Sequence, residues 1–215
     1  MKHFFILLFG LFASFYLFSQ VDNIEKDIFI YDDFETVIGI INIDDIQNIE
    51  TVSSLFFFNS ELLNFQNIAK AENLENLTII GCIFESIDYI AELKKLKTLE
   101  VTFCNLSDIN FLGSMNSLEY LAFDFNKISD ISILSKLENL KILSLSYNII
   151  SDISPLQNLY NLIYLNLKMN NIYQIYPLKD LRNLSLLDLE GNNITDFSIL
   201  KDLNDDIILF GRNVN

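Results

Sequence analysis

Two pairs of acidic residues come closest to a catalytic arrangement in this chain: Glu100 with Asp124, and Asp188 with Glu190. Paired carboxylates can hydrolyse a glycosidic bond, with one acting as the acid and the other as the base or nucleophile. That chemistry requires a site that keeps water from one carboxyl and so raises its pKa. The surrounding sequence predicts an open, solvated sheet for these residues, so we expect ordinary surface charge there and no catalysis.

The other common catalytic and metal-binding arrangements lack their residues. The one histidine of the 215 residues is His3, which lies in a segment that we expect to be removed. Without imidazole, neither a Ser-His-Asp nor a Cys-His arrangement can form, and a zinc site built on histidine is excluded. A glycine-rich phosphate loop is also missing from the sequence. We therefore predict a protein that is not an enzyme and that has no metal site and no cofactor.

The charge balance excludes a further class of function. The chain carries 14 Lys and Arg against 29 Asp and Glu, which gives a formal net charge of -15. Proteins that hold DNA or RNA through its phosphates need a cationic face, so no nucleic-acid partner is expected. With 51% hydrophobic residues the chain is too apolar to be disordered.

The first 20 residues have the character of a secretory signal peptide. Lys2 and His3 form a short basic start, and an uncharged apolar run follows over residues 4–18. This run is shorter than the roughly 20 residues that span a bilayer as a helix, which favours a cleaved signal over an uncleaved anchor. We expect an exported protein that is secreted, held at the cell surface or kept in a periplasm, with no integral membrane span once the signal is removed.

A 22-residue repeat organises the rest of the chain. Six copies follow one another without a gap over residues 74–205, and each begins with a leucine. Apolar residues at the fourth and sixth positions of each copy predict a short strand with one buried face. Apolar residues then recur at every third position, as in Ile150, Ile153 and Leu156, and predict a tight helical turn. Because no copy can bury its own apolar side, we expect the copies to stack as coils of a solenoid.

The two ends of the repeat region are less regular. Residues 52–73 keep part of the pattern and form a degenerate first repeat, whereas residues 21–51 match only the second half of a coil, at Ile40, Ile43, Ile46 and Ile49, and are predicted to be an N-terminal cap. Residues 206–215 form a partial terminal repeat, in which Ile208 and Phe210 restart the pattern one residue early. An exposed last strand could pair with a second chain, although we expect a monomer.

The ninth position of each repeat carries a polar or small residue that points inward. Asn side chains there can donate to and accept from backbone groups that would otherwise be buried without partners, so we predict a ladder of stacked amides. In the first two of the six gapless copies, which begin at residues 74 and 96, cysteines replace the amides. Strand spacing of about 4.8 Å leaves open both a disulfide and two buried thiols. The predicted ladder consists of Cys82, Cys104, Asn126, Asn148, Asn170 and Asn192.

An aspartate recurs at the thirteenth position, at Asp108, Asp130, Asp152 and Asp196. A repeated aspartate before a helical turn is typical of a cap that accepts from free amides, which we favour over a repeated cation site because the spacing of a calcium loop is absent. Pro155 and Pro177, three positions further along their repeats, fit the start of that turn.

The pattern resembles leucine-rich repeats of the 22-residue class found in bacterial internalins and in phosphatase-regulator proteins. The residues that carry the resemblance include 148–156 and 192–196. It implies an α/β solenoid, a horseshoe with a concave parallel β-sheet and short 3-10 or helical turns on its convex side, and recognition of another macromolecule by the concave residues. The sequence shows neither an immunoglobulin-like domain nor a Leu-Pro-x-Thr-Gly sorting signal, so host-cell adhesion is not carried over.

Two apolar rows are predicted for the concave face, at the third and eighth positions. Rows of this size, rich in tyrosine, favour a protein ligand, because soluble monomers rarely expose so much apolar surface. The alternatives are a glycan stacked on the tyrosines, or an envelope protein without a concave ligand whose aromatic residues stabilise the sheet. The candidate binding residues are Tyr120, Ile142, Tyr164 and Leu186 at the third position and Phe103, Phe125, Tyr147 and Met169 at the eighth.

Overall fold

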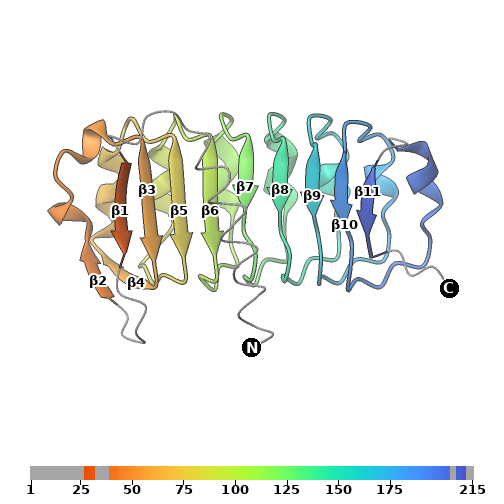
Figure 1. The fold of residues 1–215 in the computed structure, drawn as a ribbon, viewed down its shortest axis with the longest axis horizontal. Coiled ribbons are helices and arrows are strands. Elements are labelled where there is room, and N and C mark those ends of the chain that lie inside the picture. The colour runs from red at the N-terminus through yellow and green to blue at the C-terminus, as the bar shows by residue number, and fades with distance from the viewer. Residues whose placement is uncertain (1–26, 32–38, 204–206, 212–215) are drawn as a thin grey trace.

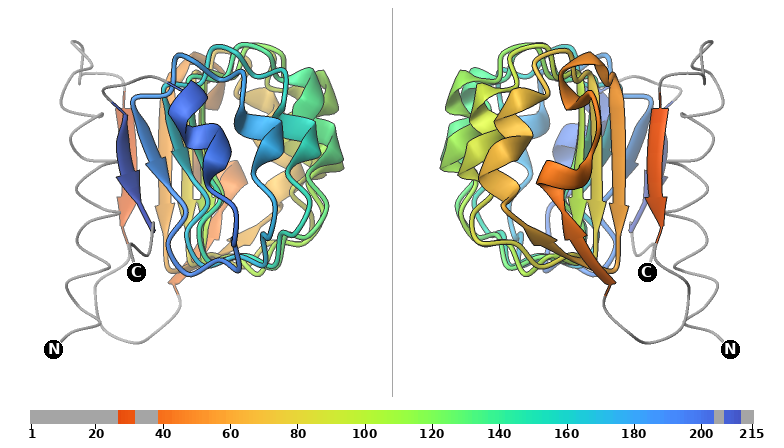
Figure 2. Two further views of the ribbon diagram at one scale, coloured as in Figure 1. Left: turned by 90° about the vertical axis from the view of Figure 1, so that its right-hand side faces the viewer. Right: turned by 90° about the vertical axis from the view of Figure 1, so that its left-hand side faces the viewer.

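The computed structural model describes residues 27–31, 39–203 and 207–211, so the predicted signal peptide lies outside the described residues. The chain winds as a solenoid in which most coils contribute one strand and one 3-10 helix (Figure 1). The strands form one layer and the 3-10 helices form a second layer behind it (Figure 2). The predicted leucine-rich repeat solenoid, with a parallel sheet and short 3-10 turns, is confirmed.

The main sheet has nine strands in the described part of the chain, all of them parallel to their neighbours. From β3 onward, the register of the strands follows the repeat, as in the pairing of Leu121 with Leu143. The strands, in spatial order, are β1 (Asp27–Tyr31), β3 (Ser54–Phe58), β5 (Asn76–Ile80), β6 (Thr98–Thr102), β7 (Tyr120–Ala122), β8 (Ile142–Ser144), β9 (Tyr164–Asn166), β10 (Leu186–Asp188) and β11 (Ile208–Phe210).

The convex layer consists of short 3-10 helices, one or two for each coil. They are η2 (Ile43–Asp45), η3 (Ile49–Thr51), η4 (Phe65–Lys70), η5 (Asp88–Glu92), η6 (Asn110–Ser114), η7 (Ser132–Lys136), η8 (Ser154–Leu156), η9 (Tyr176–Leu178) and η10 (Ser198–Asp202). Leucines at the first, fourth and sixth positions fill the space between the two layers and are buried, among them Leu143, Leu145 and Leu162. Each coil thus buries its apolar side against its neighbours.

The aspartates at the thirteenth position cap the 3-10 helices. In four coils the first backbone N–H of the 3-10 helix donates to the aspartate two positions earlier at 2.8 Å, as from Ser132 to Asp130 and from Ser154 to Asp152. The carboxylate satisfies an amide that has no partner within so short a helix. This contact confirms the predicted capping role, and Pro155 and Pro177 lie at the starts of η8 and η9, as expected.

The N-terminal end continues the main sheet further than the repeat pattern indicates. Part of the segment predicted as a cap forms β1, which pairs with β3 in a register that departs from the repeat period, with Ile28 opposite Leu55. Two further strands, β2 (Gly39–Asn42) and β4 (Ser60–Leu63), form a separate parallel pair. Ile43 and Ile49 are buried, but Ile40 on β2, which lies opposite Glu61 on β4, is 68% exposed. Strand alternation turns Ile40 outward and Ile41 inward.

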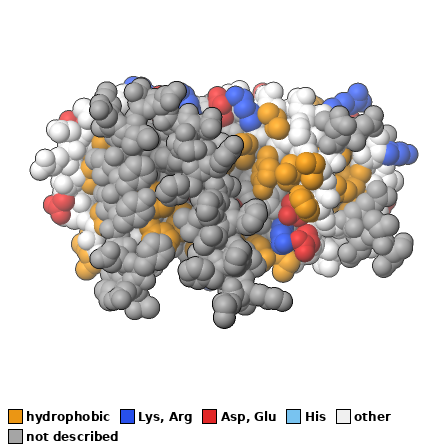
Figure 3. Space-filling view, in the orientation of Figure 1, with side chains coloured by type: hydrophobic (Ala, Val, Ile, Leu, Met, Phe, Trp, Pro, Cys, Tyr) orange, Lys and Arg blue, Asp and Glu red, His pale blue; other side chains and the backbone are white. Residues whose placement is uncertain are grey.

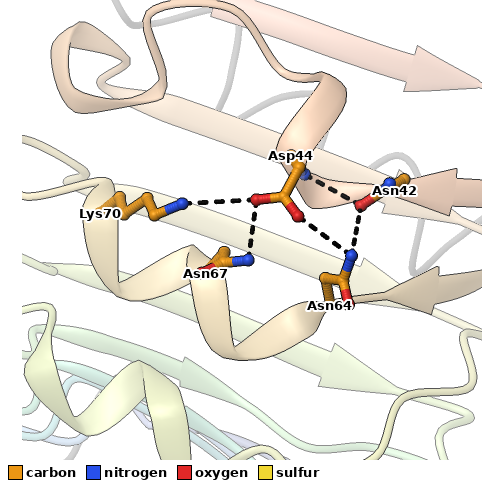
Figure 4. Close-up of polar contacts among 5 residues, drawn as sticks. All are labelled: Asn42, Asp44, Asn64, Asn67 and Lys70. Carbon is orange, nitrogen blue, oxygen red and sulfur yellow. Dashed lines mark hydrogen bonds and ion pairs between the residues drawn. The ribbon is translucent and has the colours of Figure 1, made fainter.

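A polar cluster on the convex side joins η2 to η4 (Figure 4). The carboxylate of Asp44 accepts from Asn64 at 3.0 Å and from Asn67 at 2.8 Å, and it forms an ion pair with Lys70 at 3.3 Å. Asn42 accepts from the backbone N–H of Asp44 and from Asn64. The donors surround the exposed carboxylate and connect the first complete coil to the coil before it.

The C-terminal strand keeps the register of the preceding repeats. β11 pairs with β10 so that Ile208 lies opposite Leu186 and Leu209 lies opposite Leu187. The prediction that Ile208 and Phe210 restart the pattern one residue early is therefore wrong, because parallel pairing with β10 places Leu209 at the inward fourth position. Ile208 and Phe210 instead extend the concave face of the sheet, and they are 55% and 49% exposed. None of the described residues belongs to a helix long and apolar enough to cross a membrane.

Candidate binding surface on the concave sheet face

The third-position row is continuous across the sheet. Strand register places Tyr120, Ile142, Tyr164 and Leu186 in succession on β7 to β10, and Ile208 on β11 continues them. The first four side chains are half-buried. In Figure 3, apolar side chains gather over the middle and right-hand part of this face, beside a small group of charged side chains. The sequence prediction missed Ile208 because it assigned that residue to the fourth position, although counting one repeat length onward from Leu186 leads to it.

The eighth-position residues form a second row by stacking on one another. The ring of Phe125 lies between those of Phe103 and Tyr147, with centroid distances of 4.2 and 4.1 Å. All three residues, and Met169 after them, have left-handed backbone with φ between 55° and 57°. Left-handed backbone costs a non-glycine residue of order 1 kcal/mol or more, which the ring contacts offset.

The ends of this stack differ from its middle. Phe103 and Met169 are 44% and 43% exposed, whereas Phe125 and Tyr147 between them are half-buried. Beyond Met169 the eighth position is Gly191, where an added Cβ would approach the Met169 sulfur to 2.2 Å. These contacts favour the interpretation that the eighth-position row stabilises the turns that follow the strands. The third-position row is therefore the stronger candidate for partner contact.

A polar strip separates the two rows. It contains the fifth- and seventh-position residues from the third repeat onward, including Asp124, Ser144, Ser146, Asn166, Lys168, Asp188 and Glu190. The Asp124 carboxylate accepts from the Ser144 hydroxyl at 2.7 Å and from the backbone N–H and hydroxyl of Ser146 at 2.6 and 2.7 Å. Asn166 donates to the Ser144 hydroxyl at 3.1 Å. Lys168 forms an ion pair with Glu190.

The electrostatics of the strip differ from those of a fully solvated surface. Burial raises the pKa of Asp124, while the hydrogen bonds from Ser146 and Ser144 act to lower it. The pKa of Tyr164 is raised as well, first by burial and then by the negative charges of Asp124 and Asp188. Tyr164 therefore lies within the field of both carboxylates.

The two acidic pairs considered for catalysis occupy different surroundings. Glu100 on β6 is buried and Asp124 is half-buried, so the expectation that both would be ordinary solvated charges is wrong for this pair. Asp124 loses exposure because Ser144 and Ser146 of the next coil contact its carboxylate. Asp188 is half-buried and Glu190 is exposed. No group of three or more His, Cys, Asp or Glu side chains among the residues described could hold a metal ion.

The ninth-position amides connect each coil to the one before it. Asn148 donates to the backbone carbonyls of Phe123 and Leu145 at 2.9 and 3.1 Å and accepts from the N–H of Ile128 at 2.9 Å. Asn126, Asn170 and Asn192 make the equivalent contacts in their own coils. Each amide thus satisfies backbone groups of two coils at once.

Cys82 and Cys104 are free thiols at the same position in the first two repeats. Cys82 donates to the carbonyl of Ile80 at 3.4 Å, and Cys104 donates to that of Thr102 at 3.2 Å. Burial raises the pKa of Cys82 to about 11 and that of Cys104 to about 12. The disulfide left open by the sequence is not formed in the structure.

Two further rows with the repeat spacing were not singled out from the sequence. At the last position of the repeat, Asn139, Asn161 and Asn183 donate to carbonyls of the preceding coil at 2.7 to 2.8 Å. At the second position, charges alternate, so that Lys97 pairs with Glu75 at 2.8 Å and Lys141 pairs with Glu119 at 2.7 Å. Both rows are exposed and join coils rather than forming a site.

These coils define a class of protein, the solenoids built from leucine-rich repeats. A sequence model described as Leucine Rich repeats (2 copies) matches residues 116–158. Among solved structures, internalin C2 from Listeria monocytogenes is 31% identical with a TM-score of 0.75, and the match covers 80% of this chain and 76% of that one. The chain belongs to the leucine-rich repeat proteins of the internalin type.

Two other solved structures extend the comparison. The internalin inlF of Listeria monocytogenes is 29% identical with a TM-score of 0.71, over 75% of this chain and 48% of that one, so this chain spans about half its length. The leucine-rich repeat ectodomain of the Arabidopsis thaliana receptor kinase GASSHO1/SCHENGEN3 is 26% identical with a TM-score of 0.58, over 67% and 19% of the two chains. A comparison with curated protein sequences gives no match.

Proposed function

We propose that this chain is an exported, non-catalytic recognition module that binds another protein through its concave sheet face. The observation that carries the proposal is the third-position row, in which large apolar side chains follow one another across β7 to β11 and remain partly open to solvent. A half-buried row that includes two tyrosines gives a partner a continuous apolar surface on a hydrogen-bonded sheet.

Two solved relatives lend support, since both were determined with a partner. The plant ectodomain GASSHO1/SCHENGEN3 is in complex with CASPARIAN STRIP INTEGRITY FACTOR 2, and the more distant plant receptor RGFR1 is in complex with RGF2. The expected export depends on residues 1–20, whose basic start and apolar run fit a signal peptide. N-terminal sequencing of the protein recovered outside the cytoplasm should begin after Ser19 or Gln20, and an intact Met1 there would argue for an anchor.

The binding surface can be tested with a matched pair of double variants. The full chain carrying Ile142→Ser and Tyr164→Ser should lose capture of the partner that the wild type retains, identified by mass spectrometry. The control carries Ile149→Ser and Tyr176→Ser, which removes the same side-chain types from exposed positions outside the row. Both variants should melt near the wild type, so that a loss of capture reports contact and not unfolding.

The outcomes separate the candidate functions. Loss of capture by the row variant alone supports protein binding by the concave face. Equal capture by the wild type and both variants would mean that the binding surface lies elsewhere. Binding of the wild type to a glycan on an array, with no protein captured, would favour the carbohydrate alternative.

A further inference from the structure

We draw no further inference here: the strongest candidate, the apolar third-position row that runs across β8 to β11 on the concave sheet face, belongs to the binding surface already proposed, and nothing among the described residues shows what covers it.

Discussion

The ring of Phe125 stacks on the ring of Tyr147 with centroids 4.1 Å apart and planes 10° from parallel, while both residues hold left-handed backbone. The contact joins consecutive coils at the point where the chain leaves the sheet in each coil. Since Phe103 stacks on the other side of Phe125, the phenylalanine contributes to two ring contacts.

Replacing Phe125 with alanine should therefore lower the free energy of unfolding by roughly 1–3 kcal/mol, because it removes both contacts and leaves the unfavourable backbone conformation. Urea unfolding followed by circular dichroism would measure this change. Tyr176→Ala is the control, because Tyr176 is exposed and its ring contacts the Lys179 ammonium on the convex side. If both variants unfold with the wild type, the stack has no structural role and becomes a candidate for binding again.

The buried amide ladder should respond more strongly than the exposed one. Asn148→Ala removes hydrogen bonds to backbone groups of two coils and should destabilise the protein by about 2–4 kcal/mol. Asn139→Ala is the matched control, since that amide makes an exposed bond to the carbonyl of Asn116 and should cost less than about 1 kcal/mol. Similar melting temperatures for the two variants would contradict the role of burial in the ladder.

The caps of the 3-10 helices predict a pH dependence with a defined sign. Hydrogen bonds from Ser132 and Ser198 lower the pKa of Asp130 and of Asp196 below the ordinary 3.8. A depressed pKa in the folded state contributes stability that is fully present above the ordinary value and is lost as the pH falls through the lower folded value. Asp130→Asn should thus be less stable than the wild type at pH 6, and the gap should close toward pH 3.

The control for this experiment removes a charge without removing a cap. Glu138→Gln changes an exposed residue in the turn that follows η7, and it should shift the unfolding midpoint by a similar small amount at both pH values or not at all. A constant gap between Asp130→Asn and the wild type from pH 6 to pH 3 would count against the cap as the source of the pKa change.

The two thiols should be nearly unreactive in the folded protein. The pKa values of about 11 for Cys82 and about 12 for Cys104 leave little thiolate at pH 8, and burial also limits access. Ellman's reagent should label the native protein slowly and should titrate two thiols promptly in urea without reductant. Fewer than two thiols in urea would reveal a disulfide, and rapid labelling of the native protein would show that the first coils open easily.

Much of the fold followed from the sequence because one leucine pattern recurs with a constant period. The buried fourth-position leucines and the ladder amides could be placed by counting alone, since the same contacts repeat in each coil. The left-handed eighth position also left a signal that we did not use: Gly81 and Gly191 occupy it in the first and last repeats, and both have positive φ.

The remainder depended on contacts that the repeat does not encode. The pairing of β1 with β3, in which Ile28 lies opposite Leu55, breaks the period, so the first strand could not be found by counting. The register of β11 was predicted wrongly because residues 207–210 are all apolar, so the sequence fits an inward-facing Ile208 and Phe210 as well as an inward-facing Leu209. Only the pairing with β10 distinguishes the two registers. The environment of Asp124 arises from Ser144 and Ser146 of the next coil, whose hydroxyl directions are set only when the coils stack.

The polar contacts of the ladders reach about one coil along the chain, as from Asn148 to Phe123 and from Asn139 to Asn116. They hold each coil to its neighbour and to nothing more remote, so a force applied to the two ends of the chain would meet one interface at a time. Under tension the protein should peel in steps, each releasing about 70 Å of extended chain for one repeat. A partner bound across the central strands would hold those coils together, so stepwise unfolding should stop at the coils that the partner covers.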